Sequence, residues 1–457
     1  MLNIISRLKR LILVAGDVII LYFSLWLTLF IRYQKTVSAE LWHKHLLPFT
    51  IIFTLWIIIF FINKLYDLRL AKNNLAFYAV WFNTLIWCSL IGFLFFYITT
   101  TGISPKTIMV LDVIIFGILF LLWRRLFNGM IIYSKFLENA IIVGLSKNTL
   151  ELARDINSKP QMGLKVTGIM WPKTTPGEID EQIEIISDPK RLKNFLRQKK
   201  IKMIIMDEGA RHYPQLINEL YKSLNLQMTI LDLPTFAEKF TGKVLIDTIG
   251  QMWFLENIKE NNKQFYEIIK RLMDIIISSI LLIVSIPFLP FIYLIIRLTS
   301  RGPGFFMQQR TGKNGKKFMA VKFRTMYQNA EVNGPQWAQV NDPRVTKLGK
   351  WLRKSRIDEI PQLINVLRGE MSFIGPRPER PEFIERLKQN IPFYETRLLI
   401  KPGLTGWAQI NFPYGASEED ALEKLQYDLY YIKNRSFVLD LSILLKTIKT
   451  VLSGGGQ

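Results

Sequence analysis

The first third of the chain alternates long apolar runs with short polar segments. Four such runs cover residues 11–31, 46–62, 75–98 and 107–123. Each approaches the roughly 20 residues that a helix needs to cross a bilayer. Aromatic side chains of the kind that mark membrane interfaces lie near their ends: Trp26, Trp42, Tyr66, Tyr97 and Trp123. The pattern predicts a unit of four transmembrane helices within residues 1–130.

Basic side chains orient this unit. They precede the first run, separate the second from the third and follow the fourth: Arg7, Lys9, Arg10, Lys64, Arg69, Lys72, Arg124, Arg125 and Lys135. The bias predicts that both ends of the unit face the cytoplasm. Asp17 and Asp112 lie inside apolar runs, where an acid is either functional or paired with an arginine at the membrane edge. Both interpretations stay open.

The middle of the chain repeats strand-like and helical stretches. Short apolar runs at residues 139–144, 165–170, 202–207 and 227–232 predict the strands of a parallel, Rossmann-like α/β domain over 138–255. Its first turn, from Gly144 to Asn148, lacks the further glycines of a dinucleotide fingerprint. The sequence therefore favours a degenerate domain with a structural or regulatory role.

A fifth apolar run, from Ile275 to Ile296, carries no charge. Pro287 and Pro290 interrupt it, and Ser285 can bond to the backbone groups that the break frees. Because both flanks are basic, we expect a re-entrant helical hairpin over 265–300 that enters and leaves on the cytoplasmic face. The alternative is an ordinary kinked span.

The last third is predicted to be a mixed, mainly α cytoplasmic domain over 301–457. Residues 318–326 indicate a strand that runs into a loop, and 341–346 a turn. Because proline is tolerated only in the first turn of a helix, Pro361 places a helix start near Asp358, and Gly369 is a plausible stop. Residues 437–452 have the apolar spacing of a helix that packs on the domain or lies in the membrane interface.

The composition of the chain limits the classes of molecule that it is expected to bind. The formal net charge of +22 favours an anionic partner, whereas a positive mean hydropathy of +0.18 and 13% aromatic residues are unusual for a soluble nucleic-acid binder. Phosphorylated substrates at a membrane fit better than nucleic acid. The single cysteine, Cys88, excludes an intrachain disulfide.

Two adjacent carboxylates, Asp358 and Glu359, lie in a strongly basic stretch. Their neighbours are Arg353, Lys354, Arg356, Arg368, Arg377 and Arg380. Arginine can bind phosphate oxygens bidentately, and a carboxylate can hold a divalent cation or attack phosphorus. The prolines around Arg377 would preorganise its loop. The alternative is an ion-pair network that includes Glu379 and Glu382.

At these residues the chain resembles the bacterial sugar transferase family, the polyprenyl-phosphate hexose-1-phosphate transferases. The matching stretches are RLMD at 271–274 before the broken hairpin, KFRTM at 322–326, 341–379, KPGLTGWAQIN at 401–411 and QYDLYYIKN at 426–434. The membrane unit and the Rossmann-like domain resemble the N-terminal extension of the large family members.

The resemblance implies transfer of a sugar-1-phosphate from a UDP-sugar to undecaprenyl phosphate, with release of UMP. It implies that Asp358 is the nucleophile of a ping-pong reaction and that Glu359 binds Mg²⁺. Lys322, Arg353 and Arg377 match positions suited to phosphate contact. The implied partners are the two substrates and the lipid bilayer of the bacterial inner membrane, without nucleic acid, and a homo-oligomer is compatible with the family.

Two departures from the family pattern stand out. The hairpin break reads Ser285-Ile286-Pro287 where Ser-Pro is expected, and Phe412 to Gly415 replace a glycine-arginine-asparagine stretch.

Two alternative functions also remain. A membrane-anchored nucleotide-sugar dehydratase or epimerase would need a Tyr-x-x-x-Lys pair. Tyr266 and Lys270 have this spacing, and we interpret the match as chance. A non-catalytic scaffold for polysaccharide assembly would leave the arrangement of Asp358, Glu359 and the arginines unexplained.

Overall fold

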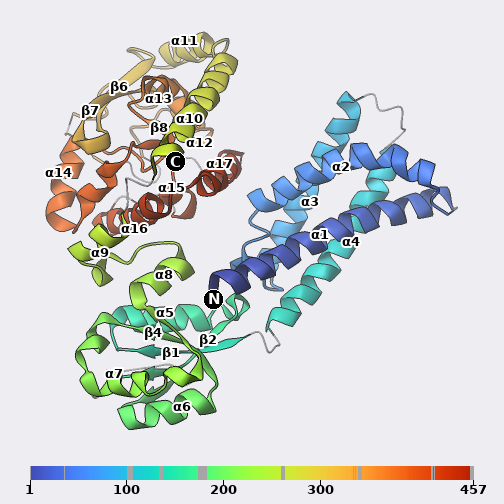
Figure 1. Cartoon of the computed structure of the whole chain (residues 1–457). Coiled ribbons are helices and arrows are strands. Elements are labelled where there is room, and N and C mark those ends of the chain that lie inside the picture. Colours follow the sequence, from blue (N-terminus) through green and yellow to red (C-terminus); the bar gives the residue numbers. More distant parts are fainter. Residues whose placement is uncertain are drawn as a thin grey trace. The chain divides into compact units, whose positions relative to one another are not determined.

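The chain forms two compact units, Met1–Phe236 and Ala237–Gln457, in this computed structural model (Figure 1). The structure describes residues 2–34, 36–99, 106–132, 137–172, 183–258, 263–332, 334, 336–337, 342–412, 415 and 417–452. Pro413 and Tyr414 of the second departure, Asn341 of the expected turn and Lys135 of the basic flank lie outside them.

The first unit begins with four long helices, as the apolar runs predict. They are α1 (Leu2–Tyr33), α2 (Ala39–Ile62), α3 (Leu75–Ile98) and α4 (Lys106–Ile132). Each contains a stretch of 24 to 26 residues that is long and apolar enough to cross a membrane. Helices α2 and α3 begin where the side chains of Ser38 and Asn74 accept a first-turn N–H. Figure 1 shows α1 running beside α4.

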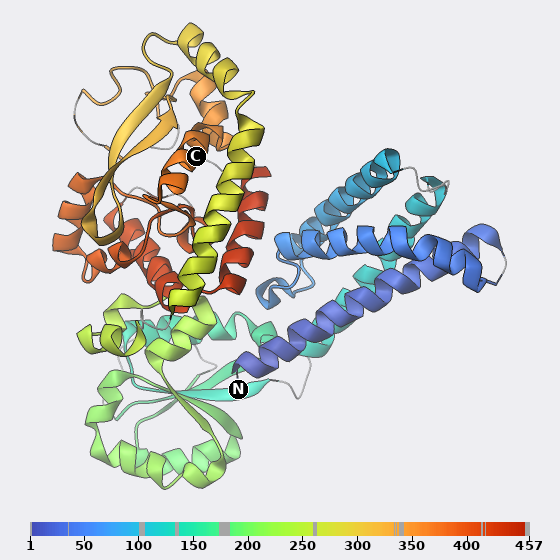
Figure 2. The ribbon, with the colours of Figure 1, turned by 45° about the horizontal axis from the view of Figure 1, so that its top comes forward.

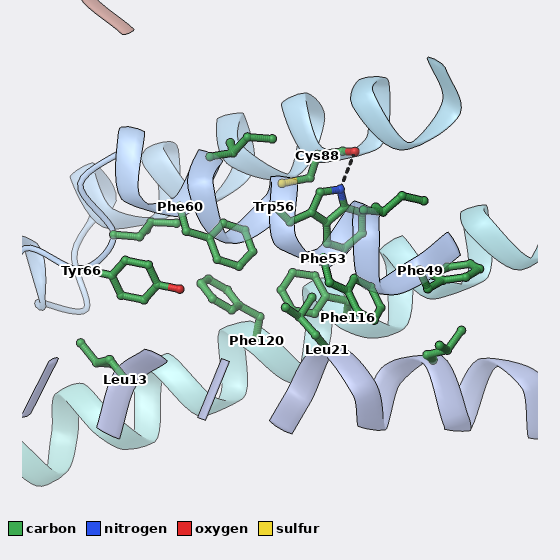
Figure 3. Close-up of a cluster of buried hydrophobic side chains, with 14 of the residues drawn as sticks. Leu13, Leu21, Phe49, Phe53, Trp56, Phe60, Tyr66, Cys88, Phe116 and Phe120 are labelled. Atoms are coloured by element: carbon green, nitrogen blue, oxygen red, sulfur yellow. Dashed lines mark hydrogen bonds between the residues drawn. The ribbon is translucent and has the colours of Figure 1, made fainter. Parts of the chain in front are cut away.

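Aromatic side chains fill the space between these helices (Figure 3). One face of α2 supplies Phe49, Phe53, Trp56 and Phe60, all fully or almost fully buried. The Trp56 ring lies 5.3 Å from that of Phe116 on α4. Its indole N–H donates to the carbonyl of Cys88 at 2.9 Å, so the polar edge of this ring is satisfied inside an apolar bundle.

The two acids of the apolar runs have different partners. Arg124 donates to Asp17 at 2.6 Å, and both side chains are buried. Arg124 also donates to the carbonyl of Leu65 at 2.9 Å. Asp112 instead accepts from the Ser24 hydroxyl at 2.8 Å. Pairing with an arginine is therefore correct for Asp17 and wrong for Asp112, whose described partner is a hydroxyl.

A five-stranded parallel sheet follows in the first unit, as the alternating pattern predicts. Its order is β3-β2-β1-β4-β5, with β1 (Glu138–Val143), β2 (Leu164–Met170), β3 (Glu184–Ile186), β4 (Ile201–Met206) and β5 (Thr229–Asp232). The helices are α5 (Lys147–Asn157), α6 (Leu192–Gln198), α7 (Pro214–Tyr221) and α8 (Leu233–Thr241), which crosses the unit boundary. Strand β3 is missing from the prediction because three residues are too short for a pattern.

The second unit combines helices with two small sheets. Its helices are α9 (Gln251–Asn257), α10 (Gln264–Ser285), α11 (Leu289–Thr299), α12 (Lys347–Lys354), α13 (Leu363–Arg368), α14 (Pro381–Asn390), α15 (Trp407–Asn411), α16 (Glu418–Asn434) and α17 (Phe437–Leu452). Strands β6 (Phe305–Thr311) and β7 (Lys317–Phe323) form an antiparallel hairpin, and β8 (Ser372–Ile374) pairs with β9 (Gly403–Thr405) in parallel. The mixed, mainly α character agrees with the prediction.

Helices α10 and α11 form a bent pair, with an angle of 62° at the break (Figure 2). Helix α10 ends at Ser285, whose hydroxyl donates to the Leu281 carbonyl at 2.6 Å, and Pro287 lies in the break. Proline cannot donate the N–H that would continue the ladder, so the bend follows from the sequence. The pair is long and apolar enough to be a broken span or a re-entrant loop.

Candidate active site

Asp358 and Glu359 lie on a 3-10 helix, Ile357–Gln362, that packs against β7. The expectation that an α-helix begins near Asp358 is wrong in type, because α13 begins only at Leu363. Pro361 lacks an N–H and disfavours the α conformation of the residue before it. The helix dipole of α13 therefore starts five residues too late to attract an anion to Asp358, and the side chains of the site must supply the positive charge.

Three basic side chains surround Glu359. Arg377 Nη2 donates to its Oε1 at 2.5 Å, the Nζ of Lys322 lies 3.9 Å from the same oxygen, and Arg356 Nη1 lies 3.7 Å from Oε2. Burial alone would raise the pKa of Glu359, but these cations, Arg377 foremost, hold it well below its usual range. Glu359 is therefore an ionised carboxylate at neutral pH.

Asp358 has a different environment from its neighbour. It is almost fully buried, and its Oδ1 accepts no hydrogen bond from the residues that the structure describes. Burial, and then the charge of Glu359, raise its pKa to about 6. A carboxylate that is poorly solvated, yet still ionised near neutral pH, keeps its nucleophilicity.

The predicted phosphate-binding residues fall into two groups. Lys322 and Arg377 point to Glu359 from β7 and from the loop after β8. Burial lowers the pKa of Lys322 to about 8. Arg353 approaches from α12, where its Nε donates to Thr325 Oγ1 at 2.9 Å, and its charge lowers the pKa of Asp358 more than that of Arg377 does. The structure thus brings Lys322 and Arg377 to Glu359, and Arg353 acts on Asp358.

A small cleft opens beside Glu359. Its lining includes Lys322, Glu359 and Arg377, together with Arg310, which the sequence analysis missed. Arg310 donates to the Pro378 carbonyl at 3.2 Å and lies 3.8 Å from Glu379. The β6–β7 register pairs Arg310 with Phe318 and Phe306 with Lys322, so both cations share one face of the hairpin. Reading residues 305–323 as a hairpin with alternating faces would have found Arg310.

The loop that carries Arg377 is fixed by backbone contacts. The Gly375 N–H donates to Thr405 O and the Gly403 N–H to Pro376 O, both at 2.8 Å. A Cβ on Gly375 would lie 2.5 Å from the Lys401 carbonyl oxygen, so only glycine permits this approach. From behind, buried Arg397 donates to the Arg377 carbonyl at 2.9 Å and to Asp428 at 3.0 Å. Sequence reasoning missed Arg397, because no local pattern connects it with Arg377.

The donor set is compatible with a magnesium ion. The described residues contain no cluster of three or more His, Cys, Asp or Glu side chains that could hold a metal. Mg²⁺, however, usually takes one or two carboxylates and completes its shell with water and substrate phosphates. Glu359 offers such oxygens at the wall of the cleft, and the neighbouring Asp358 carries a second carboxylate, whose buried Oδ1 accepts no hydrogen bond from the described residues.

The first turn of the Rossmann-like sheet is less suited to a ligand. The Thr149 N–H of α5 already bonds to Ser146 Oγ, and the Ser146 N–H to Thr149 Oγ1. A Cβ on Gly144 would lie 2.4 Å from the Cβ of Asp207, which places a carboxylate beside the turn. In the described part of this sheet edge, the Ser146 and Thr149 amides are already bonded and the Asp207 carboxylate is negatively charged, so neither favours binding of a pyrophosphate.

Tyr266 and Lys270 do not form a dehydratase site. Both bond to Oδ2 of the buried Asp440, at 2.7 and 3.0 Å. They tie α10 to α17 within the second unit, so this pair has a structural role.

Comparisons with known proteins agree with these observations. Residues 265–454 match the family model described as bacterial sugar transferase, and residues 62–207 match one described as a CoA-binding domain. An uncharacterized sugar transferase of Haemophilus influenzae is 31% identical over 365 residues, which cover 74% of this chain and 75% of that protein.

Two further relatives carry more specific names. The undecaprenyl-phosphate galactose phosphotransferase of Salmonella typhimurium is 30% identical over 73% of this chain and 72% of its own length. The UDP-N-acetylgalactosamine-undecaprenyl-phosphate N-acetylgalactosaminephosphotransferase of Aeromonas hydrophila is 42% identical over 50% of this chain. This chain spans about half of that relative's length, 53%.

Proposed function

We propose, because the chain belongs to the bacterial sugar transferase family, that it transfers a sugar-1-phosphate from a UDP-sugar to undecaprenyl phosphate and releases UMP. The observation that carries the proposal is the excess of positive charge around Glu359, which lines a cleft and is adjacent to Asp358. Lys322, Arg356 and Arg377 all lie within 4 Å of Glu359. A diphosphate would balance this charge.

In the first half of the proposed reaction, an oxygen of the Asp358 carboxylate attacks the sugar-linked phosphorus of the UDP-sugar. The bond from that phosphorus to the bridging oxygen breaks, and UMP leaves with the electron pair. The sugar phosphate is then esterified to Asp358. Arg377, which now donates to Glu359, is placed to donate instead to a phosphate oxygen and to stabilise charge in the transition state.

In the second half, a phosphate oxygen of undecaprenyl phosphate attacks the same phosphorus. The bond to Asp358 breaks, which restores the carboxylate and yields the diphosphate-linked lipid sugar. A covalent route lets one site serve a soluble and a lipid substrate in turn. Mg²⁺, when bound, would offset the charge of the diphosphate, and Glu359 would hold it.

The proposed setting is the bacterial inner membrane. Four helices are apolar enough to cross it, and the exposed face of α10 and α11 is also apolar, with Phe265, Ile283 and Phe291 each more than 60% exposed. We propose that the bent pair is a re-entrant hairpin that keeps the second unit at the cytoplasmic surface. Cysteine labelling near residues 265 and 305 should then report the same side, and labelling of 305 from outside would refute this topology.

The direct test of the activity is a UMP-release assay on the full chain in membranes. UDP-N-acetylgalactosamine, UDP-galactose and UDP-glucose are supplied with and without undecaprenyl phosphate. Sustained UMP release that depends on the lipid acceptor supports the proposal and identifies the sugar. Absence of UMP release with every sugar, from folded protein, contradicts it.

A further inference from the structure

Helix α10 attaches to the second unit through polar residues on one face. Arg271, Asp274 and Ser278 are spaced three to four residues apart, with Lys270 one turn before Asp274, and Asp274 and Ser278 are buried. The opposite face carries exposed apolar residues such as Leu272 and Ile276. This is the reverse of a soluble amphipathic helix, whose apolar face packs on the protein. Helix α10 is therefore held to the rest of the second unit by individual polar contacts and not by an apolar face.

Arg271 holds the helix that follows the acid pair. Its Nη1 donates to the Val366 carbonyl at 2.6 Å, and its Nη2 to the Leu367 carbonyl at 2.7 Å. Both carbonyls belong to the last turn of α13, where intrahelical donors run out and a cation is favoured. Since α13 continues directly from the 3-10 helix of Asp358 and Glu359, Arg271 restrains the far end of the segment that carries them.

Asp274, one turn further along α10, holds the strand that leads to Arg377. Its Oδ1 accepts from the Phe373 N–H at 2.9 Å and from the Ser372 hydroxyl at 3.1 Å. These residues begin β8, and Arg377 follows its last residue by three positions. Asp274 thus restrains the near end of the loop that brings Arg377 to Glu359.

The two attachments lie inside one continuous stretch of chain. Residues 358 to 377 run out from the acid pair and return to it, and the Arg377–Glu359 bond of 2.5 Å closes the loop. Arg271 contacts this loop at 366–367, and Asp274 contacts it at 372–373. One rigid helix therefore fixes both arms of the loop whose closure forms the site.

We propose that Arg271 and Asp274 are positioning residues that set the distance between the acid pair and Arg377. They would couple the helix of the membrane-associated bent pair to the geometry of the site, so that a shift of α10 reaches Glu359 and Arg377 together. The effect of Arg271 and Asp274 on turnover rests on the proposed function, whereas the coupling of α10 to Glu359 and Arg377 does not. A misplacement of about 1 Å far from the reacting atoms can cost on the order of 10²-fold in rate.

A purely structural role makes a different forecast, and Lys270 offers a matched control. Its Nζ bonds to Asp440 on α17 at 3.0 Å, so it also ties α10 to the unit. It makes no described bond to residues 358–377. If α10 needs only to be attached, Lys270→Met should harm the enzyme as much as a change at Arg271 or Asp274.

The test uses the full chain in lipid nanodiscs. Arg271→Gln and Asp274→Leu should each lower kcat for UMP release about 10- to 100-fold, whereas Lys270→Met should stay within about threefold of wild type. Asp274→Asn keeps an acceptor oxygen for the Phe373 N–H and should recover most of the rate. Amide hydrogen exchange over residues 363–379 should rise in the first two variants and not in Lys270→Met.

Several outcomes overturn the proposal. The proposal is wrong if folded Arg271→Gln and Asp274→Leu keep the wild-type kcat. It is also wrong if Lys270→Met loses as much kcat as they do, or if Asp274→Asn does not recover the rate that Asp274→Leu loses. If Arg271→Gln does not fold, Arg271→Lys replaces it, because one ammonium group cannot serve both carbonyls in the same way, and an unchanged rate there is again contradictory. Hydrogen exchange reports on the coupling even if wild type releases no UMP, so failure of the proposed function remains distinguishable.

Discussion

Two acid–arginine pairs, one in each unit, have the same chemical groups but differ in their exposure. Asp17 and Arg124, between α1 and α4, expose 0% and 2% of their side chains. Glu359 and Arg377 expose 11% and 34% and line a cleft. The first pair is closed to ligands, and the second is accessible.

The charge balance differs even more than the exposure. Asp17 pairs with Arg124 alone among the described ion pairs, so the two charges cancel. Glu359 lies within 4 Å of three cations, and even with Asp358 ionised a positive charge remains. An ion pair by itself therefore says little about function. An unbalanced cluster at a cleft indicates an anionic ligand.

The largest expected effect comes from Asp358→Asn. If Asp358 forms the covalent bond to the sugar phosphate, its amide should reduce UMP release by at least about 10⁴-fold, because an amide is not a competent nucleophile. Labelled sugar phosphate should remain on the wild-type protein and be absent from the variant. Asp342→Asn, at another buried aspartate, is the control and should stay within about threefold. A variant that still makes lipid-linked sugar efficiently would remove Asp358 from this role.

Metal removal should have the next largest effect. Chelation with EDTA should lower UMP release by at least about 10²-fold, since a bound cation contributes several kcal/mol of charge stabilisation. Added Mg²⁺ should restore it, and Glu359→Gln should need a higher Mg²⁺ concentration for half-maximal rate. Full activity in EDTA would mean that the basic residues alone balance the diphosphate.

Arg377→Lys should have a smaller effect on the same cluster. A lysine keeps the charge but loses the forked donor geometry, so kcat/KM should fall about 10- to 100-fold. Arg380→Lys is a control three residues away in the same loop, because Arg380 pairs with Glu331 and Glu382 instead of Glu359. It should stay within about threefold. Equal losses in both variants would indicate a general effect on the loop.

The sequence predicts the parts of this site better than their assembly. The four helices, the parallel sheet and the break after Ser285 follow from apolar periodicity and proline positions, which are local signals. Asp358 and Glu359 stand out because they interrupt a basic stretch. Arg310 and Arg397 were missed because strand register and a contact between distant segments place them. The 3-10 start at Ile357 was missed because proline excludes a helix interior without specifying which helix type precedes it.

Asp17→Asn should have the smallest effect on turnover and sharpens the comparison most directly. Turnover per folded molecule should stay within about threefold, because Asp17 belongs to the first unit and not to the cluster around Glu359. Stability should fall by about 3 kcal/mol, since removal of one partner leaves Arg124 buried and unpaired. Thermal inactivation in nanodiscs, with residual UMP release as the signal, measures both quantities.

The double variant Asp17→Leu with Arg124→Leu completes this test. If the pair is structural, replacing both charges by apolar side chains should recover much of the stability that Asp17→Asn loses, because no buried charge is left unpaired. The same replacement of Glu359 and Arg377 should abolish UMP release, whatever it does to stability. Loss of turnover in the folded Asp17 and Arg124 double variant would contradict the distinction, since it would show that a balanced, closed pair also serves the reaction.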